Sequence, residues 1–158
     1  MSDKSRQVVR KELLINASQL RTFQAFTEQI DHWWPRSHHI GKSEMKRAVL
    51  ETKGGGRWYE IGVDGSQCDW GKVLVFDPPH KLILAWQITA QWQYDPNFLT
   101  EVEVNFIEQG PNRTRLTLEH RNIEKFGLKA EEMWSAFDSE GGWTGMLNAL
   151  AKHAEGRA

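Results

Sequence analysis

Residues 133–150, with the sequence MWSAFDSEGGWTGMLNAL, carry the pattern that decides the fold. Their larger apolar side chains recur at intervals of about three and four residues, as they do along one face of a helix. These positions are Met133, Ala136, Phe137, Trp143, Met146, Leu147 and Leu150. We therefore predict one long amphipathic helix near the C-terminus, whose apolar face must pack against another part of the chain.

Two features inside this stretch leave its geometry open. Gly141 and Gly142 each cost about 1 kcal/mol relative to Ala within a helix, so they indicate either a close approach to the sheet or a break near Ser139. Glu140 falls on the same helical face as Trp143. It is either exposed, or buried with a partner such as Arg57 or a Trp N–H group. A buried Glu140 would have a raised pKa and would be a candidate acid or base.

Upstream of this helix the periodicity changes to two, which is typical of strands. A first strand is predicted at residues 7–15, and six more are predicted at residues 44–51, 56–63, 68–76, 81–91, 98–108 and 113–121. Short turns rich in Gly, Pro and Asn join the six, which favours an antiparallel meander with one apolar face. Both faces of residues 81–91 are apolar, so we expect that strand to be central.

Two helices are predicted between the first strand and the second. Ser18 stands where an N-cap belongs, ahead of apolar residues at helical spacing that reach Ile30, so we expect about three turns of helix. Asp31 could cap a short second helix over residues 32–34, which must end before Pro35. The chain is thus α+β: a seven-stranded curved antiparallel sheet closed by the C-terminal helix.

Composition excludes several classes of protein. Lys and Arg number 20 against 21 Asp and Glu, so no positive field is available for nucleic acid or an anionic membrane. The polar start of the chain predicts no leader segment, and no apolar run approaches the length of a membrane span. Cys68 is alone, which suits a reducing compartment. We expect a single soluble, cytoplasmic domain over residues 1–158.

Tryptophan is the unusual component, with eight Trp and seven Phe against two Tyr. These rings either fill the core or line a cavity for a flat apolar ligand. The residues that we select as ligand-binding candidates are Trp33, Trp34, Trp58, Trp86, Trp143 and Met146. Trp86 lies on the apolar face of a central strand and Trp143 on the helix face opposite, while Trp33 and Trp34 would border the mouth of the cavity.

Polar candidates are few. Arg57, His120 and Glu140 would serve an acid/base enzyme if at least two of them met in one cavity, although a hydrogen-bonded place in the core or at its rim suits His120 better than a catalytic role. His32, His38, His39 and Glu44 lie close in sequence, but no two are locked on one face of a helix or strand. We therefore predict no metal site and no cofactor.

The order of elements, with particular residues at their joints, resembles the START-like helix-grip superfamily, also called SRPBCC. The likeness is to the bacterial branch similar to the C-terminal domain of the ninety-kilodalton heat-shock ATPase activator. The matching features are Asn16-Ala17-Ser18, Trp33-Trp34, Gly54-Gly55-Gly56-Arg57-Trp58, Gly71-Lys72-Val73, Asp77-Pro78-Pro79 with Leu82 and Trp86, the run from Thr114 to His120, and Gly142-Trp143 with Leu147 and Leu150.

The resemblance implies a concave sheet wrapped around the last helix, with a mostly apolar pocket between them. It favours binding of a small apolar or aromatic ligand without catalysis. The alternatives are a pocket acid/base enzyme of the cyclase, dehydratase or hydrolase type, and an interaction domain whose partner is a chaperone or a second copy of the chain. The activators carry a separate N-terminal domain that is not part of this sequence, so ATPase stimulation is not expected.

Overall fold

Seven strands form one antiparallel sheet in the order β1-β7-β6-β5-β4-β3-β2 in the computed structural model, which describes residues 7–156. The strands are β1 (Val9–Ile15), β2 (Met45–Leu50), β3 (Arg57–Gly62), β4 (Gln67–Asp77), β5 (Lys81–Trp86), β6 (Thr100–Gly110) and β7 (Arg113–Arg121). The predicted meander is confirmed, with β1 added at the edge beside β7. The polar start of the chain, residues 1–6, lies outside the described residues.

Strand β5 is central, as its two apolar faces predict, and Leu82, Leu84 and Ala85 have no exposed surface. The prediction that it extends to residue 91 is wrong, because the strand ends at Trp86. Beyond that point the chain folds back on itself: the Thr89 N–H donates to the Gln93 carbonyl and the Asp95 N–H to the Gln87 carbonyl. These local bonds replace the ladder to β6 and make a loop of residues 87–99.

The first helix, α1 (Gln19–Phe26), begins where predicted and ends earlier. Its N-cap is Ser18, whose Oγ accepts a hydrogen bond from the Arg21 N–H across 3.1 Å. The second helix, α2 (Ile30–Trp33), has no side-chain cap. Asp31 does not cap it, because the Asp31 carboxylate accepts from the Ala48 N–H at 2.9 Å and pairs with Arg36 at 2.8 Å.

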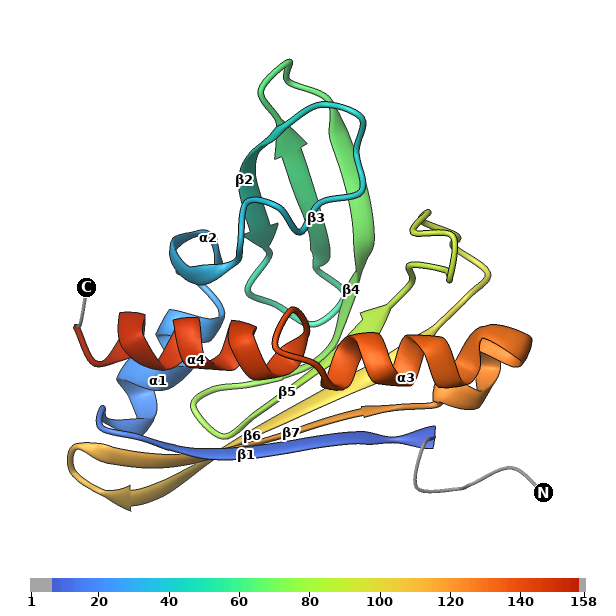
Figure 1. The fold of residues 1–158 in the computed structure, drawn as a ribbon. Helices are drawn as coiled ribbons and strands as arrows, with labels where there is room; N and C mark the ends of the chain where they lie inside the picture. The colour runs from blue at the N-terminus through green and yellow to red at the C-terminus, as the bar shows by residue number, and fades with distance from the viewer. Residues whose placement is uncertain (1–6, 157–158) are drawn as a thin grey trace.

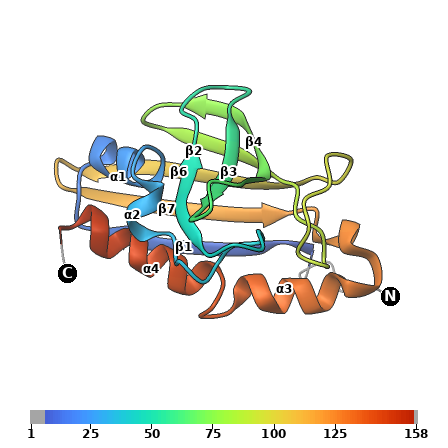
Figure 2. The same cartoon turned by 90° about the horizontal axis from the view of Figure 1, so that it is seen from above.

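The prediction of a single long C-terminal helix is wrong in detail, because the segment forms two helices with a break between them. A short 3-10 segment, η2 (Ile123–Lys129), leads into α3 (Ala130–Asp138), and α4 (Trp143–Ala154) follows. The break needs Gly142, where a Cβ atom would lie 2.3 Å from the Ala136 carbonyl oxygen. Of the two readings of the glycine pair, the break near Ser139 is therefore correct. Figures 1 and 2 show α3 and α4 end to end across the concave side of the sheet.

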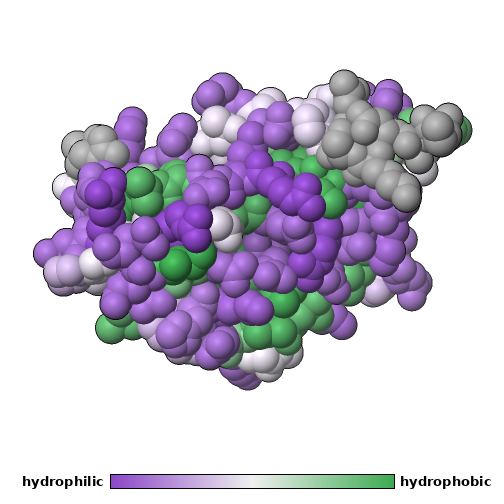
Figure 3. All heavy atoms as spheres, turned by 90° about the horizontal axis from the view of Figure 1, so that it is seen from below, coloured by the Kyte–Doolittle hydropathy of each residue, from purple (hydrophilic) through white to green (hydrophobic). Residues whose placement is uncertain are grey.

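The core lies between the concave face and these helices. Helix α4 buries Trp143, Met146, Leu147 and Leu150 against the sheet, as the helical spacing predicts. The opposite face of β1, β7 and β6 carries ion pairs, including Arg121 with Glu101, Glu103 and Glu119. Seen from that side, the surface is mainly hydrophilic with separate hydrophobic patches (Figure 3). Among residues 7–156, no helix is long and apolar enough to span a bilayer.

Candidate functional site

A cavity of about 370 Å³ opens between the sheet, the α3–α4 break and the segment that joins α2 to β2. We call that segment, residues 35–44, the strap. Large apolar side chains make most of the wall: Trp34, Trp70, Trp86, Trp92, Phe137 and Met146. Its polar side chains are Ser37, His38, His39 and Ser139. No Asp, Glu, Lys or Arg of the described chain lines it, so the cavity suits a neutral ligand.

The strap is joined to the helices by His38. The Nε2 atom of His38 lies 2.6 Å from the Gly141 carbonyl oxygen, within the α3–α4 break. A carbonyl only accepts hydrogen bonds, so Nε2 carries a proton and donates it. The Trp34 indole N–H donates to the His38 carbonyl at 2.9 Å. The strap therefore spans the cavity between α2 and the helix break.

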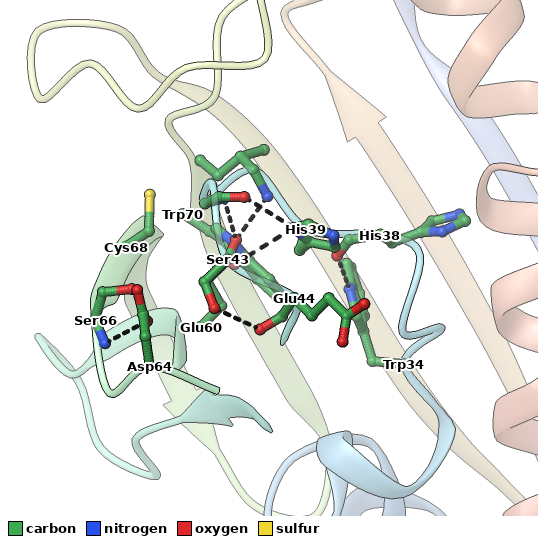
Figure 4. A network of polar contacts seen from close by, with 12 residues as sticks. Trp34, His38, His39, Ser43, Glu44, Glu60, Asp64, Ser66, Cys68 and Trp70 are labelled. Carbon is green, nitrogen blue, oxygen red and sulfur yellow. Dashed lines mark hydrogen bonds and ion pairs between the residues drawn. The ribbon is translucent and has the colours of Figure 1, made fainter. Parts of the chain in front are cut away.

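Glu60 joins the strap to the sheet. It lies on β3 with only 1% of its surface exposed. Its Oε1 atom accepts hydrogen bonds from the Ile40 N–H at 2.7 Å, the Gly41 N–H at 3.2 Å and the Trp70 indole N–H at 2.8 Å. Its Oε2 atom lies 3.9 Å from Nδ1 of His39. One buried carboxylate thus holds two residues of the cavity wall, Ile40 and Trp70, and lies beside a third, His39; Figure 4 shows this cluster.

The ring of His39 has a defined tautomer. Its Nδ1 atom lies 3.0 Å from the Gly41 carbonyl oxygen, which can only accept, so Nδ1 carries a proton. Within residues 7–156, Nε2 of His39 makes no hydrogen bond. In Figure 4 the ring of His38 projects away from the cluster around Glu60, whereas His39 lies against it. The two neighbouring histidines are therefore differently bonded: Nε2 is a donor in His38 and a free acceptor in neutral His39.

Trp92 borders the cavity from the loop after β5. Its φ of 59° lies in the left-handed region, which is rare for a bulky residue. Nearly half of the side chain, 47%, is exposed, and its ring meets the Phe137 ring edge-on with centroids 6.4 Å apart. A strained, half-exposed tryptophan on a cavity wall points to function more than to packing.

The predicted aromatic site divides into two layers. Trp34, Trp86 and Met146 line the cavity, whereas Trp33, Trp58 and Trp143 do not. Those three are buried behind the wall, where Trp58 and Trp143 pack edge-on against Trp86 at 5.8 and 6.2 Å. Whether any of the six contacts a ligand stays a prediction.

The three polar candidates do not converge, so the condition for an acid/base site built from them, that at least two share one cavity, is not met. Glu140 is exposed in the helix break. Arg57 lies on the face of β3 opposite to Trp58 and Glu60, where it pairs with Asp69 at 2.8 Å and lies 3.9 Å above the Tyr59 ring. His120 is wholly buried, and none of the three lines the cavity.

His120 is a core residue in a fixed protonation state. The Trp143 indole N–H donates to its Nδ1 atom at 3.2 Å, and its Nε2 atom lies 2.9 Å from the Thr100 hydroxyl oxygen. Burial lowers the pKa of His120 to about 3. The imidazole is therefore neutral, which selects the core interpretation over the catalytic one.

Sequence reasoning missed Trp70 and Glu60. Glu60 alternates with Trp58 on β3, so the period of two already places its carboxylate on the apolar face. Trp70 was left out of the aromatic candidates, although its side chain is buried beside Glu60. No three His, Cys, Asp or Glu side chains within residues 7–156 are placed to hold a metal. His32, one of the histidines weighed as a metal ligand and not selected, stacks on His153 with ring centroids 5.1 Å apart.

A curved antiparallel sheet, a helix pair across its concave face and an apolar cavity between them define a START-like helix-grip protein. The family profile described as "Activator of Hsp90 ATPase homolog 1-like protein" matches residues 16–155, and the chain belongs to this family. The comparison with curated protein sequences gave no match.

Solved structures support the same assignment. The anthrahydroquino-Gama-pyrone synthase Txn09, complexed with SUM, is 35% identical with a TM-score of 0.66, covering 92% of this chain and 95% of that one. The self-sacrificing resistance protein CalC from Micromonospora echinospora is 26% identical with a TM-score of 0.71, covering 96% of each chain. Protein NE0264 from Nitrosomonas europaea shares the fold at 14% identity, with a TM-score of 0.67 over 99% of each chain.

Proposed function

We propose that this protein binds a flat, neutral, multi-ring aromatic molecule in the cavity beneath the strap. The observation that carries the proposal is the wall itself, where four tryptophans, Phe137 and Met146 surround about 370 Å³ with no carboxylate or ammonium group in the lining. Such a wall holds a flat ligand by buried area and by ring stacking. The volume falls within the usual range for small-molecule sites, about 300–1,000 Å³.

One relative favours the same ligand class. The synthase at 35% identity is named for a product that joins an anthrahydroquinone to a pyrone, which is a fused aromatic system. That name describes the relative and not this chain. It agrees with a cavity whose rings come from the sheet, the strap and the helices, so that a planar molecule would meet aromatic faces on several sides.

Binding can be tested with a panel of ligands that differ in shape. We suggest alizarin as a hydroxylated fused aromatic, unsubstituted anthraquinone, cholesterol as a sterol and palmitate as a flexible chain. Alizarin and anthraquinone should quench the tryptophan fluorescence and raise the melting temperature, because a ligand of the native state stabilises it. Quenching without saturation, or a shift with palmitate alone, would contradict the proposed ligand class.

A cavity-filling variant shows where the ligand lies. Ala136 lines the cavity from α3, so Ala136→Trp should fill it and reduce alizarin binding by more than tenfold. Ser135 precedes it on the same helix with an exposed side chain that is not part of the wall, so Ser135→Trp is the matched control. Equal binding by the two variants would place the ligand elsewhere on the protein.

Catalysis on the bound molecule is a second candidate function, and the specific observation in its favour is that the solved structure with 35% sequence identity is named as a synthase. Because Glu140, Arg57 and His120 lie outside the cavity, the reacting groups would have to come from Ser37, His38 and His39 of the strap or from Ser139 in the α3–α4 break. Mass spectrometry of hydroxylated aromatics incubated with the protein would reveal turnover, and an Ala136→Trp protein would serve as the blank.

Partners beyond a small molecule also belong to this proposal. The sole cysteine and the balanced charge favour a cytoplasmic location without nucleic acid. The family description supports a chaperone as an additional partner. Pull-down of the ninety-kilodalton heat-shock ATPase would support that contact, and light scattering would show whether a second copy of the chain binds.

A further inference from the structure

We propose that His39, supported by Glu60, accepts the proton of an acidic hydroxyl group on the bound aromatic molecule. The inference rests on the proposed function, because it names the polar group of the same cavity and the ligand chemistry that this group selects. A phenol or enol fits, since its hydroxyl is acidic enough to share or give up a proton to an imidazole. A sterol or a hydrocarbon ring would gain nothing from this group.

The first step of the argument is the geometry of the imidazole. Nδ1 of His39 is committed to the Gly41 carbonyl oxygen at 3.0 Å, so the lone pair of the neutral ring is on Nε2. His39 belongs to the cavity wall, and 27% of its side chain is accessible. Nε2 is therefore the nitrogen that a ligand can reach, and it is a base.

The second step is the carboxylate behind the ring. Oε2 of Glu60 lies 3.9 Å from Nδ1 of His39, within ion-pair distance once the ring is charged. Oε1 is held by three N–H donors, which fixes the carboxylate in place. The carboxylate is thus placed to pair with the ring once Nε2 has taken a proton from the ligand.

The proton balance is simple. The O–H bond of the ligand breaks and its electron pair stays on the ligand oxygen, while an N–H bond forms at Nε2 of His39. The resulting imidazolium keeps its Nδ1–H bond to Gly41 and faces Glu60. The strap also carries the titratable groups of His38, Lys42 and Glu44, and Cys68 lies on β4. Burial raises the pKa of the Cys68 thiol, so it stays neutral.

His38 is the comparison that the chain itself offers. It lies next to His39, it also lines the cavity, and its Nε2 atom already donates to Gly141. It therefore has no free basic Nε2 to offer a ligand. Comparing variants of His38 and His39 therefore distinguishes a general effect of any imidazole near the ligand from an effect of the specific hydrogen bonding at His39.

The experiment uses alizarin, whose visible absorption moves to longer wavelength when a hydroxyl ionises. Bound alizarin is titrated between about pH 5 and pH 8 in the wild type and in His39→Gln. The colour change should occur about one pH unit higher in His39→Gln, because the proton acceptor is gone. Affinity for unsubstituted anthraquinone, which has no proton to give, should change less than about twofold. His80→Gln, an exposed histidine outside the cavity, is the control for the number of histidines.

Four outcomes decide the matter. If neither dye binds the wild type, the proposed function fails. If both bind and the colour titration is the same in wild type and His39→Gln, the role of His39 is overturned while the cavity keeps its ligand class. A shift on His38→Gln in place of His39→Gln also overturns it. Glu60→Gln keeps an acceptor oxygen, so with an unchanged near-ultraviolet circular dichroism spectrum it should shift the titration in the same direction as His39→Gln. No shift would refute the part assigned to Glu60.

Discussion

Trp143 donates its indole N–H to Nδ1 of His120 across 3.2 Å, and this contact sets the state of a wholly buried imidazole. An indole nitrogen is only a donor, so Nδ1 must carry a lone pair. Nε2 then bears the proton and donates to the Thr100 hydroxyl at 2.9 Å. Helix α4 is therefore joined to β7 and β6 by two hydrogen bonds through His120, and this arrangement requires the neutral imidazole.

Because these two hydrogen bonds require neutral His120, the free energy of unfolding should fall in acid. Burial lowers the pKa of His120 from 6.5 to about 3 in the folded protein, so below pH 6.5 the unfolded chain binds a proton that the folded chain refuses. The stability that neutral His120 contributes is fully present above pH 6.5 and is lost as the pH falls from 6.5 towards 3. Between about pH 7 and pH 5, urea unfolding should show a loss of about 2 kcal/mol from this group.

The control for that loss is His120→Gln, which can still accept from Trp143 and donate to Thr100 but does not titrate. It should be less stable at neutral pH and should lose about 2 kcal/mol less than the wild type over the same interval. Other groups contribute equally to both proteins, so the difference in slope isolates His120. Parallel curves for the two proteins would show that His120 takes up its proton in the folded state.

The α3–α4 break leads to a prediction about two neighbouring glycines. A Cβ atom at Gly142 would lie 2.3 Å from the Ala136 carbonyl oxygen and 2.4 Å from that of Phe137, whereas at Gly141 the nearest such contact is Ser139 Oγ at 3.9 Å. Gly142→Ala should therefore lower the free energy of unfolding by about 3 kcal/mol. Gly141→Ala should change it by less than about 0.5 kcal/mol.

Chemical denaturation of the two glycine variants gives the answer directly. Alizarin affinity should fall with Gly142→Ala, because the backbone of the break forms part of the cavity wall. A loss in Gly142→Ala as small as that expected for Gly141→Ala would mean that the break tolerates a side chain and that the glycines are there for another reason.

The sequence predicts the sheet and the helix faces well because each depends on a local period. Alternation along residues 113–121 matches β7 without an error at either end, and the spacing from Trp143 to Leu150 gives the buried face of α4. The strand predicted over residues 81–91 runs past the end of β5 at Trp86, because Ile88 continues the alternation. The hydrogen bond from the Thr89 N–H to the Gln93 carbonyl turns the chain away from the sheet there. A period does not show where a strand stops when the turn itself contains apolar residues.

The site is less predictable because its contacts join distant segments. Glu60 bonds to Ile40 and Gly41, about twenty residues earlier, and His38 bonds to Gly141, more than a hundred residues later. None of these contacts has a sequence spacing that a local pattern reveals. Arg57 and Glu140 were chosen for their chemistry, and both lie outside the cavity because the neighbouring backbone turns their side chains to the surface.

Glu60 on β3 should be the residue on which the strap depends most. Replacing it with Ala leaves the Ile40 and Gly41 N–H groups and the Trp70 indole N–H without their acceptor, at a cost of about 1–3 kcal/mol for each buried group that finds no other partner. Glu60→Ala should therefore lose about 3 kcal/mol or more in urea unfolding. Hydrogen exchange at the Ile40 and Gly41 amides should accelerate at the same time.

Glu44 is the matched control, because it is an exposed carboxylate at the end of the same strap. Glu44→Ala should change the stability by less than about 0.5 kcal/mol and leave the two amides protected. If exchange at Ile40 and Gly41 in Glu60→Ala equals that of the wild type, the strap is held by His38 and Trp34 and the carboxylate is dispensable.

Substitutions at Trp92 should separate an effect on stability from an effect on ligand binding. Its left-handed backbone costs energy for any residue with a Cβ atom, so Trp92→Gly should be about 0.5–1 kcal/mol more stable than Trp92→Ala. Both variants remove the ring that borders the cavity next to Phe137, and both should bind alizarin about tenfold more weakly than the wild type. Thermal unfolding and fluorescence titration measure the two effects on the same samples.

Trp92→Phe completes this comparison, since it keeps an aromatic face and the strained φ. Its affinity should lie within about threefold of the wild type, because the stacking surface is reduced but present. A Trp92→Gly protein that binds alizarin as tightly as the wild type would show that the ligand does not reach this side of the wall. A Trp92→Gly protein that is less stable than Trp92→Ala would show instead that the loop relaxes out of the left-handed conformation when the ring is removed.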